Sequence, residues 1–324
     1  MHNAATQPML SLVIPVYNNE ENLPRLFAAL EELDARMPGQ LEVVFVTDGP
    51  TDGSLRQLRA KLPAWRLRTQ LVELSRNFGS FAAIQAGLAE GRGEFFAVLA
   101  ADLQEPIDLI ARFHQILATG EADVALGQRT SRADQAWSSS LFWRLYRRFA
   151  VRDTPEGGVD IFGCTRQVRD HLVALTEVNT NLVALLLWLG FRRAVVPYAR
   201  QARLEGRSGW TLGRKIRYAL DSIFSFTDLP VRALLLLGGL GTLFALVASV
   251  TVFVMWTLGR IPVLGYTPLM LVITLFGGLT ALGLGIIGQY QWLALQNARR
   301  RPNFVVKTVE TFDPQRSTAA RNSS

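Results

Sequence analysis

The stretch that decides the fold is LSLVIPVYNNEENLPRLFAALEELDARMPGQLEVVFVTDGPTDG, residues 10–53. Leu10–Val16 is an apolar run of the length of a buried strand, and Glu42–Thr47 is a second one. Between them, Glu20–Met37 carries leucines at the spacing of one helical face. A strand, a helix and a second strand in this order predict a parallel βαβ unit.

The same alternation continues along the chain to about residue 127. We expect further helices over Ser54–Leu62, Phe81–Ala89 and Asp108–Thr119, and further strands over Gln70–Leu74, Phe95–Ala100 and Asp123–Gly127. This pattern predicts an α/β fold with a doubly wound, mostly parallel sheet. Such sheets bind ligands at the carboxyl ends of their strands. The loops that matter are therefore Tyr17–Glu21, Asp48–Gly53, Ser75–Ser80 and Ala101–Pro106.

The positive charge of the chain is confined to its last third. The 324 residues carry a formal net charge of +7. Residues 1–205 hold 22 Lys/Arg against 23 Asp/Glu, whereas residues 206–324 hold 12 against 4. The N-terminal part therefore has no basic field of its own, which argues against a nucleic-acid partner. Cys164 is the single cysteine, so neither an internal disulfide nor a cysteine-rich zinc site is possible.

Two long stretches of this basic third have no charged residue. They are Ala233–Leu258 and Ile261–Ala298, and about 20 apolar helical residues suffice to cross a bilayer. We predict a transmembrane hairpin of two helices within residues 233–298. Inside the second helix, Gly277, Ala281 and Gly285 share one face, which favours close helix packing within the hairpin or in a homo-oligomer.

Basic residues gather at the two outer ends of the predicted hairpin, which lie on the same side of the membrane. Arg214, Lys215, Arg217 and Arg232 precede it and Arg299–Arg301 follow it, whereas Arg260 alone lies in the connection. The positive-inside rule then places the N-terminal domain (1–205) and the basic tail (299–324) in the cytoplasm. Residues 206–232 include Gly209–Thr227, which is amphipathic and predicted to lie in the membrane interface. Its basic side would attract anionic lipid.

The loops at the strand ends carry the candidate chemistry. Tyr17 offers a flat face to a base, and Asp48 can accept hydrogen bonds from a base or ribose. Asp102 follows the fourth strand with Gln104 two residues later, and oxygen ligands of this kind can hold a divalent ion on a diphosphate. Each of these features is also compatible with ordinary turn chemistry when taken alone.

Taken together, PVYNNEENL, VTDGPTDGS, LSRNFGSFAAIQAG and ADLQEP, with VDIFGCTRQV further on, resemble glycosyltransferase family 2. The similarity covers about residues 10–306 and is to the branch that acts on polyprenyl phosphates. It implies a GT-A-like fold, a nucleotide-diphospho-sugar donor, a polyprenyl phosphate acceptor of the undecaprenyl type and a divalent metal, Mg²⁺ or Mn²⁺. It also implies inversion at the anomeric carbon and a place in the bacterial inner membrane, serving the cell envelope.

The resemblance also assigns roles to individual residues. It implies Asp102 and Gln104 as metal ligands, and Asp102, Asp160 and Arg129 as catalytic residues. Arg129 and Arg132 would hold the acceptor phosphate. The nucleotide site would comprise Pro15, Tyr17, Asn18, Asp48 and Ala101.

The motifs depart from the family pattern at one chemically important place. The first aspartate of the family's Asp-x-Asp pair is Ala100 here, which removes one potential metal ligand. Two alternative functions are open, and Ala100 bears on the first of them. One is a catalytically weakened pseudo-glycosyltransferase that binds a nucleotide sugar or a partner protein as a membrane scaffold. The other is a processive polysaccharide synthase, although only two spans and no processivity motif are present to support a translocation pore.

Overall fold

The computed structural model describes residues 9–130, 159–175, 182–199, 229–258, 260, 266–299 and 301–313. The chain divides into two compact units. The first comprises residues 1–147, 151–211 and 302–324, and the second comprises residues 148–150 and 212–301. The predicted interfacial segment Gly209–Thr227 lies outside the described residues.

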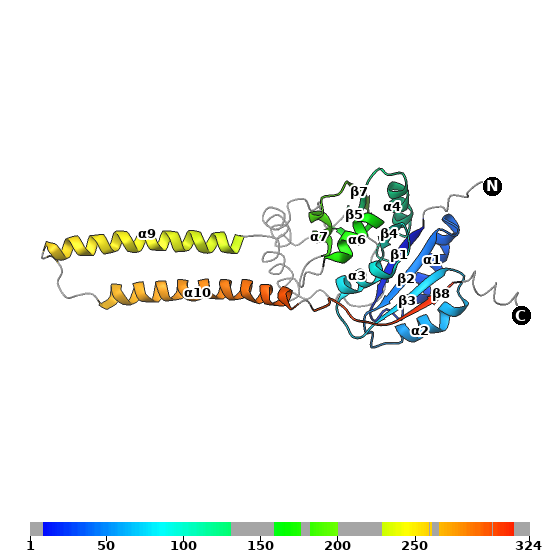
Figure 1. Ribbon diagram of the computed structural model, residues 1–324, viewed down its shortest axis with the longest axis horizontal. Coiled ribbons are helices and arrows are strands. Elements are labelled where there is room, and N and C mark those ends of the chain that lie inside the picture. Colours follow the sequence, from blue (N-terminus) through cyan, green and yellow to red (C-terminus); the bar gives the residue numbers. More distant parts are fainter. Residues whose placement is uncertain are drawn as a thin grey trace, which may run out of the picture. The chain divides into compact units, whose positions relative to one another are not determined.

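The first unit is built on an eight-stranded sheet in the order β7-β5-β6-β4-β1-β2-β3-β8 (Figure 1). Strands β1 to β4 pair in parallel, and β7 is parallel to β5. Two strands are antiparallel to their neighbours: β6, which lies between β4 and β5, and β8, which pairs with β3. The prediction of a mostly parallel α/β sheet is confirmed. The strands are β1 (Leu10–Val16), β2 (Leu41–Thr47), β3 (Arg68–Leu74), β4 (Phe95–Val98), β5 (Val124–Arg129), β6 (Val159–Thr165), β7 (Arg193–Tyr198) and β8 (Val306–Phe312).

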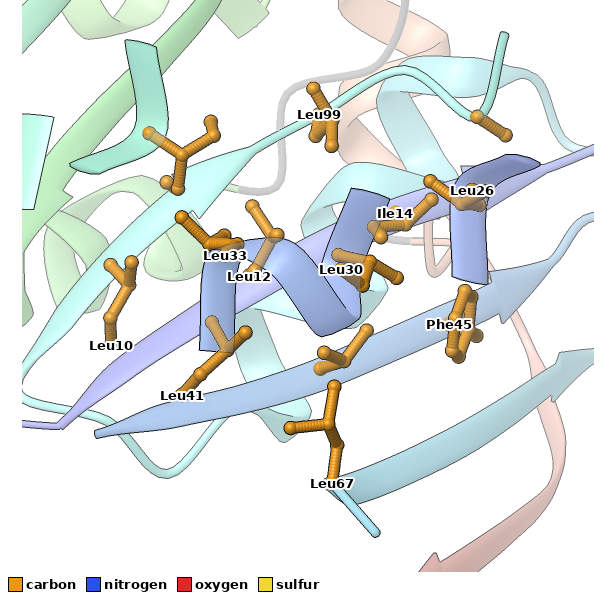
Figure 2. Close-up of a cluster of buried hydrophobic side chains, with 14 of the residues drawn as sticks. Leu10, Leu12, Ile14, Leu26, Leu30, Leu33, Leu41, Phe45, Leu67 and Leu99 are labelled. Atoms are coloured by element: carbon orange, nitrogen blue, oxygen red, sulfur yellow. The ribbon is translucent and has the colours of Figure 1, made fainter. Parts of the chain in front are cut away.

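The helices of this unit cover both faces of the sheet. One face of β1 presents Leu10, Leu12 and Ile14 to the leucines of α1, and all of these side chains are fully buried (Figure 2). The same cluster includes side chains from α2 and α4. The helices are α1 (Leu23–Arg36), α2 (Ser54–Lys61), η1 (Leu62–Ala64), α3 (Ser80–Glu90), α4 (Asp108–Ala118), α6 (Arg166–Ala174) and α7 (Leu182–Trp188).

Helix α3 packs on the opposite face of the sheet, and a glycine allows the close approach. A Cβ at Gly87 would lie 2.4 Å from Cγ1 of Val13 and 2.8 Å from Cγ2 of Val46. Val13 alternates with the residues that face α1, as the two-residue period of a strand requires. This close packing fixes the position of α3, whose first residue directly follows the loop after β3.

Strand β8 is a feature that the sequence did not reveal. Residues 299–324 are predicted as a basic tail, yet Val306–Phe312 pairs with β3 along its whole length and belongs to the first unit. A carboxylate anchors it: Glu73 of β3, 7% exposed, accepts hydrogen bonds from Nζ of Lys307 at 2.6 Å and from Nη2 of Arg59 at 2.8 Å. The first unit therefore includes a strand contributed from the far end of the chain.

The anchor of β8 should make stability sensitive to acid. Burial favours the protonated form of Glu73, but the hydrogen bonds from Lys307 and Arg59 outweigh this effect and hold the pKa of Glu73 below its ordinary value. Because the folded pKa is lowered, this contribution is present above the unfolded value and is lost as the pH falls through the folded one. We expect Glu73→Gln to flatten the acid limb of the plot of Tm against pH. Parallel curves for the variant and the wild-type protein would contradict this assignment.

The second unit contains two long helices that run side by side, α9 (Leu229–Thr257) and α10 (Tyr266–Ala298) (Figure 1). Glycines bring them together, because a Cβ at Gly241 would lie 3.3 Å from Phe276 and one at Gly283 would lie 3.1 Å from Leu234. Gly277 and Gly285 have open space at their Cβ positions, so their face does not form the hairpin contact. Within the described residues, no helix combines the length and apolar character that crossing a membrane requires.

Candidate active site

The candidate site lies along one edge of the sheet. Tyr17, Asp48 and Asp102 follow the carboxyl ends of β1, β2 and β4, which are parallel. Strand β5 has the same direction, because β6 is antiparallel both to it and to β4, so Arg129 ends at this edge too. The strand order reverses between β1 and β4, and such a switch point opens a crevice for ligands in doubly wound sheets.

The first two loops of this edge are held together by hydrogen bonds. Oδ1 of Asn18 accepts the backbone N–H of Thr51 at 2.8 Å, and the N–H of Glu20 donates to Oδ2 of Asp52 at 3.0 Å. Asn18 adopts φ +52°, which asparagine tolerates better than most residues. Asn18, predicted to contact the nucleotide, thus holds the second loop. Tyr17 next to it is 47% exposed and presents its ring to solvent.

Asp52 strengthens this connection by remaining ionised. Burial raises the pKa of Asp52. Hydrogen bonds from the side chain and backbone of Ser54 and from the backbone of Glu20 lower it by more, so the pKa lies below its ordinary value.

Pro15 lies one residue before the end of β1 and two residues beyond the last pairing with β4. Its missing N–H therefore breaks no ladder bond with that strand.

Asp48 is clamped by the loop that follows β3. Its side chain is 3% exposed, Oδ1 accepts the N–H of Phe78 at 2.7 Å, and Oδ2 accepts the N–H of Gly79 at 2.9 Å. Its own N–H donates to the carbonyl of Val16 at 3.0 Å. Asp48, which is predicted to contact the nucleotide, therefore joins the ends of β1 and β2 to the loop 75–79. This pair of backbone donors is not visible in the sequence.

Gly49 allows the two loops to meet, and this contact yields a prediction. It adopts φ +60°, and a Cβ there would lie 2.6 Å from the backbone nitrogen of Asn77. We expect Gly49→Ala to lower the free energy of unfolding by roughly 1–3 kcal/mol, because the clash is with backbone and cannot be relieved by a rotamer change. Gly39→Ala is the matched control, because Gly39 has φ +71° but open space around its Cβ. Chemical denaturation that gave equal losses for both variants would show that φ alone, and not the loop contact, sets the cost.

The loop after β4 is strained where it carries its polar side chains. The N–H of Leu103 bonds to the carbonyl of Ala100 at 3.2 Å, and Leu103 has φ +51°, an unfavourable value for a leucine. Its side chain packs against the main core, which holds the turn in place. The turn sets Asp102 half-buried at the edge, with Ala101 and Gln104 buried beside it in sequence.

The donor set of this loop fits a divalent cation. Asp102 supplies a carboxylate and Gln104 an amide oxygen, and Mg²⁺ binds through few protein oxygens plus water and substrate phosphates. Glu105, 2% exposed, is a further carboxylate that the sequence analysis did not single out. The signal for it was present, because it is an acidic residue in the same loop. Among the described residues, no three acidic, histidine or cysteine side chains form a preassembled metal cluster.

The remaining predicted residues fall at or beyond the same edge. Arg129 is the last residue of β5, half-buried, and pairs in register with Tyr198. Asp160 lies at the start of the antiparallel strand β6, which places its backbone near the end of β5. The pairing of these two strands is irregular between Leu126 and Gln128, and such bulges often redirect side chains at functional sites. Arg132 lies outside the described residues.

The mixed α/β sheet, with its switch point between β1 and β4, is GT-A-like. The model of the family described as glycosyl transferase family 2 matches residues 11–173, the part of the chain that contains β1 to β6 and the edge described above. The chain therefore belongs to glycosyltransferase family 2.

Curated relatives match nearly the whole chain. An uncharacterised glycosyltransferase of Synechocystis sp. is 33% identical over 305 residues, covering 93% of this chain and 95% of the relative. The SfII prophage-derived bactoprenol glucosyl transferase of Shigella flexneri is 28% identical over 312 residues, covering 94% and 99%. Among solved structures, glucosyl-3-phosphoglycerate synthase of Mycobacterium tuberculosis superposes with a TM-score of 0.51 at 18% identity, covering 68% of this chain and 80% of that one. The structural match supports the fold alone.

Proposed function

We propose that the protein transfers one sugar from a nucleotide-diphospho-sugar to a polyprenyl phosphate of the undecaprenyl type. The proposal rests on the similarity of the whole chain to a named relative, taken together with the fold. A relative named as a bactoprenol glucosyl transferase matches 99% of its own length, including the region of the two long helices. Meanwhile, the candidate donor-site residues of this chain converge on one sheet edge.

The proposed reaction does not require a strong general base. A phosphate monoester has a second pKa of about 6, so the acceptor is mostly dianionic at neutral pH. One of its oxygens forms a bond to the anomeric carbon on the face opposite the leaving group, the bond from that carbon to the diphosphate breaks, and a nucleoside diphosphate departs. The configuration is therefore inverted. What the protein must supply is alignment and charge stabilisation.

The residues divide this work between donor and acceptor. Tyr17 is exposed to stack on the base, whereas Asp48 and Asn18 shape the loops around the nucleotide. Asp102 and Gln104 would hold Mg²⁺ or Mn²⁺, which when bound supplies positive charge against the donor diphosphate. Arg129, with Arg132, would hold the acceptor phosphate, and Asp160 would orient the acceptor or the sugar. Arginine suits the phosphate role because its fork of donors matches phosphate oxygens.

We also propose that α9 and α10 form a transmembrane hairpin within residues 233–298. The sequences of these two helices supply the support. The helices are 29 and 33 residues long, and the stretches Ala233–Leu258 and Ile261–Ala298 have no charge. Large apolar side chains along both are exposed, for example Leu236 at 64% and Leu284 at 64%. Such surfaces suit lipid better than water.

The proposed topology places residues 1–205 and the C-terminal end in the cytoplasm of a bacterium, at the inner membrane. Residues 206–232 would lie in the interface and gather anionic lipid, and a homo-oligomer would use the open face of Gly277 and Gly285. Alkaline extraction of membranes, with protease accessibility of both termini, tests the topology. Release of the protein into the supernatant would refute the hairpin.

The function itself is tested with purified protein in liposomes that contain undecaprenyl phosphate. Labelled UDP- and GDP-sugars are added, and the label is followed into the organic phase. We expect transfer from one of these donors and release of the nucleoside diphosphate. Donor binding without any lipid-linked product would instead support the scaffold alternative that Ala100 raises.

A further inference from the structure

Residues 302–312 follow α10 and belong to the first unit, where they make contacts beyond the strand pairing of β8. We call these residues the C-terminal strap. Past the irregularity at Glu73 and Leu74, the N–H of Ser75 donates to the carbonyl of Val305 at 2.9 Å. The strap therefore follows β3 past its end and holds the first residue of the loop 75–79.

A second contact of the strap is with α3, the helix that follows that loop. Nδ2 of Asn303 donates to Oε1 of Gln85 at 3.1 Å, and Gln85 is 6% exposed in α3. Nε2 of Gln85 donates in turn to the carbonyl of Leu175 at 2.8 Å, so α3 is held between the strap and the end of α6. Through Val305 and Asn303, two positions apart, the strap therefore contacts both the first residue of the loop 75–79 and the helix that begins directly after the loop.

This loop is the one that grips Asp48. The N–H groups of Phe78 and Gly79 each donate to one carboxylate oxygen, at 2.7 and 2.9 Å, and the backbone of Asn77 lies against Gly49. A shift of the loop by a few tenths of an ångström would lengthen both bonds or force Asp48 to follow. The geometry of the donor edge thus depends on a segment more than 200 residues away in sequence.

We propose that the C-terminal strap positions the nucleotide site, with Asn303 and Lys307 acting as positioning residues through the loop 75–79 on Asp48. This inference rests on the proposed function, because it gives Asp48 a role at the donor site. Lys307 acts through its contact with Glu73, the residue of β3 that precedes Leu74 and Ser75. Neither residue touches the reacting atoms. Their effect is expected in donor affinity rather than in acceptor affinity.

The test measures binding of UDP and GDP to the full-length protein in detergent, together with steady-state KM values for donor and acceptor. We expect Asn303→Ala and Lys307→Met to raise the Kd of the bound nucleotide by about threefold to tenfold, the effect of losing one hydrogen bond or ion pair that holds the loop. The KM for polyprenyl phosphate should stay unchanged. Lys307→Arg keeps the charge and should restore binding to within about twofold of wild type.

Val309→Thr is the matched control on the same strand. Val309 is 40% exposed, and threonine keeps its shape. This variant should bind nucleotide as the wild-type protein does. A lower Tm in Asn303→Ala with unchanged nucleotide Kd would overturn the inference, as would equal rises in both KM values, because a merely structural contact would give either result.

Asp48→Asn separates this inference from the proposed function. If Asp48→Asn binds UDP and GDP as tightly as wild type, or if wild type binds neither, the donor-site assignment itself fails and the strap inference fails with it. If Asp48→Asn weakens binding and Asn303→Ala does not, the strap inference alone is rejected. Weakening in both variants, with a double variant no worse than Asp48→Asn, is the expected result.

Discussion

Asp102→Asn should lower the rate of sugar transfer roughly 100-fold or more, with little change in Tm. The carboxylate lies half-buried in a strained turn at the carboxyl end of β4. Because Ala100 has no side-chain oxygen, Asp102 would carry more of the proposed metal binding than one aspartate does in an Asp-x-Asp pair. Loss of a preorganised charge that opposes developing negative charge costs two to three powers of ten in rate. Initial rates in the liposome assay, measured across a range of Mn²⁺ concentrations, check this prediction.

Asp108→Asn is the control for Asp102→Asn. Asp108 lies six residues further on, in the first turn of α4, and pairs with Arg36 on the surface. Its replacement changes the same charge close by but should leave transfer unchanged. If Asp102→Asn retained wild-type transfer at every metal concentration, Asp102 would have no role as a metal ligand, and Glu105 would be the next residue to examine.

Arg129→Ala should raise the KM for polyprenyl phosphate by about tenfold to 100-fold and leave nucleotide binding nearly unchanged. A hydrogen bond between charged groups contributes about 1.5–3 kcal/mol, which corresponds to this range. The guanidinium extends from the last residue of β5, at the edge shared with Asp102. Titration of undecaprenyl phosphate at saturating donor measures the effect.

Arg193→Ala controls for the general loss of a positive charge. Arg193 pairs in register with Val124, at the opposite end of the same two parallel strands, and is exposed. We expect a wild-type KM for the acceptor from this variant. A rise in donor Kd for Arg129→Ala, without a rise in acceptor KM, would move Arg129 to the nucleotide side of the site.

Much of the fold follows from local pattern. The strands predicted over Leu10–Val16 and Glu42–Thr47 match β1 and β2 within one residue. Both strands are buried on two faces, so their sequences are nearly continuous apolar runs that are easy to recognise. The helix predicted over Glu20–Met37 begins instead at Leu23. Its first residues are used in bonds to the next loop, such as that from the N–H of Glu20 to Asp52, and these compete with a helical start.

What the sequence could not supply is contact between distant segments. The predicted sites at Asp48 and Asp102 lie at one edge because the strand order brings them there, and apolar runs predict strands without their order. Strand β8 was missed because KTVETF, residues 307–312, alternates with charged residues and follows a basic run that is typical of a tail. Pairing with β3 and the neutralisation of Glu73 stabilise it, and neither partner is near it in sequence.

Mass spectrometry of the lipid-linked product tests the central claim most directly. The full-length protein in liposomes would receive undecaprenyl phosphate and a mixture of nucleotide sugars. The account predicts a lipid with one phosphate and one sugar residue, together with free nucleoside diphosphate. A lipid that carried a second phosphate, or more than one sugar, would contradict it, because the first would mean transfer of a sugar phosphate and the second processive synthesis.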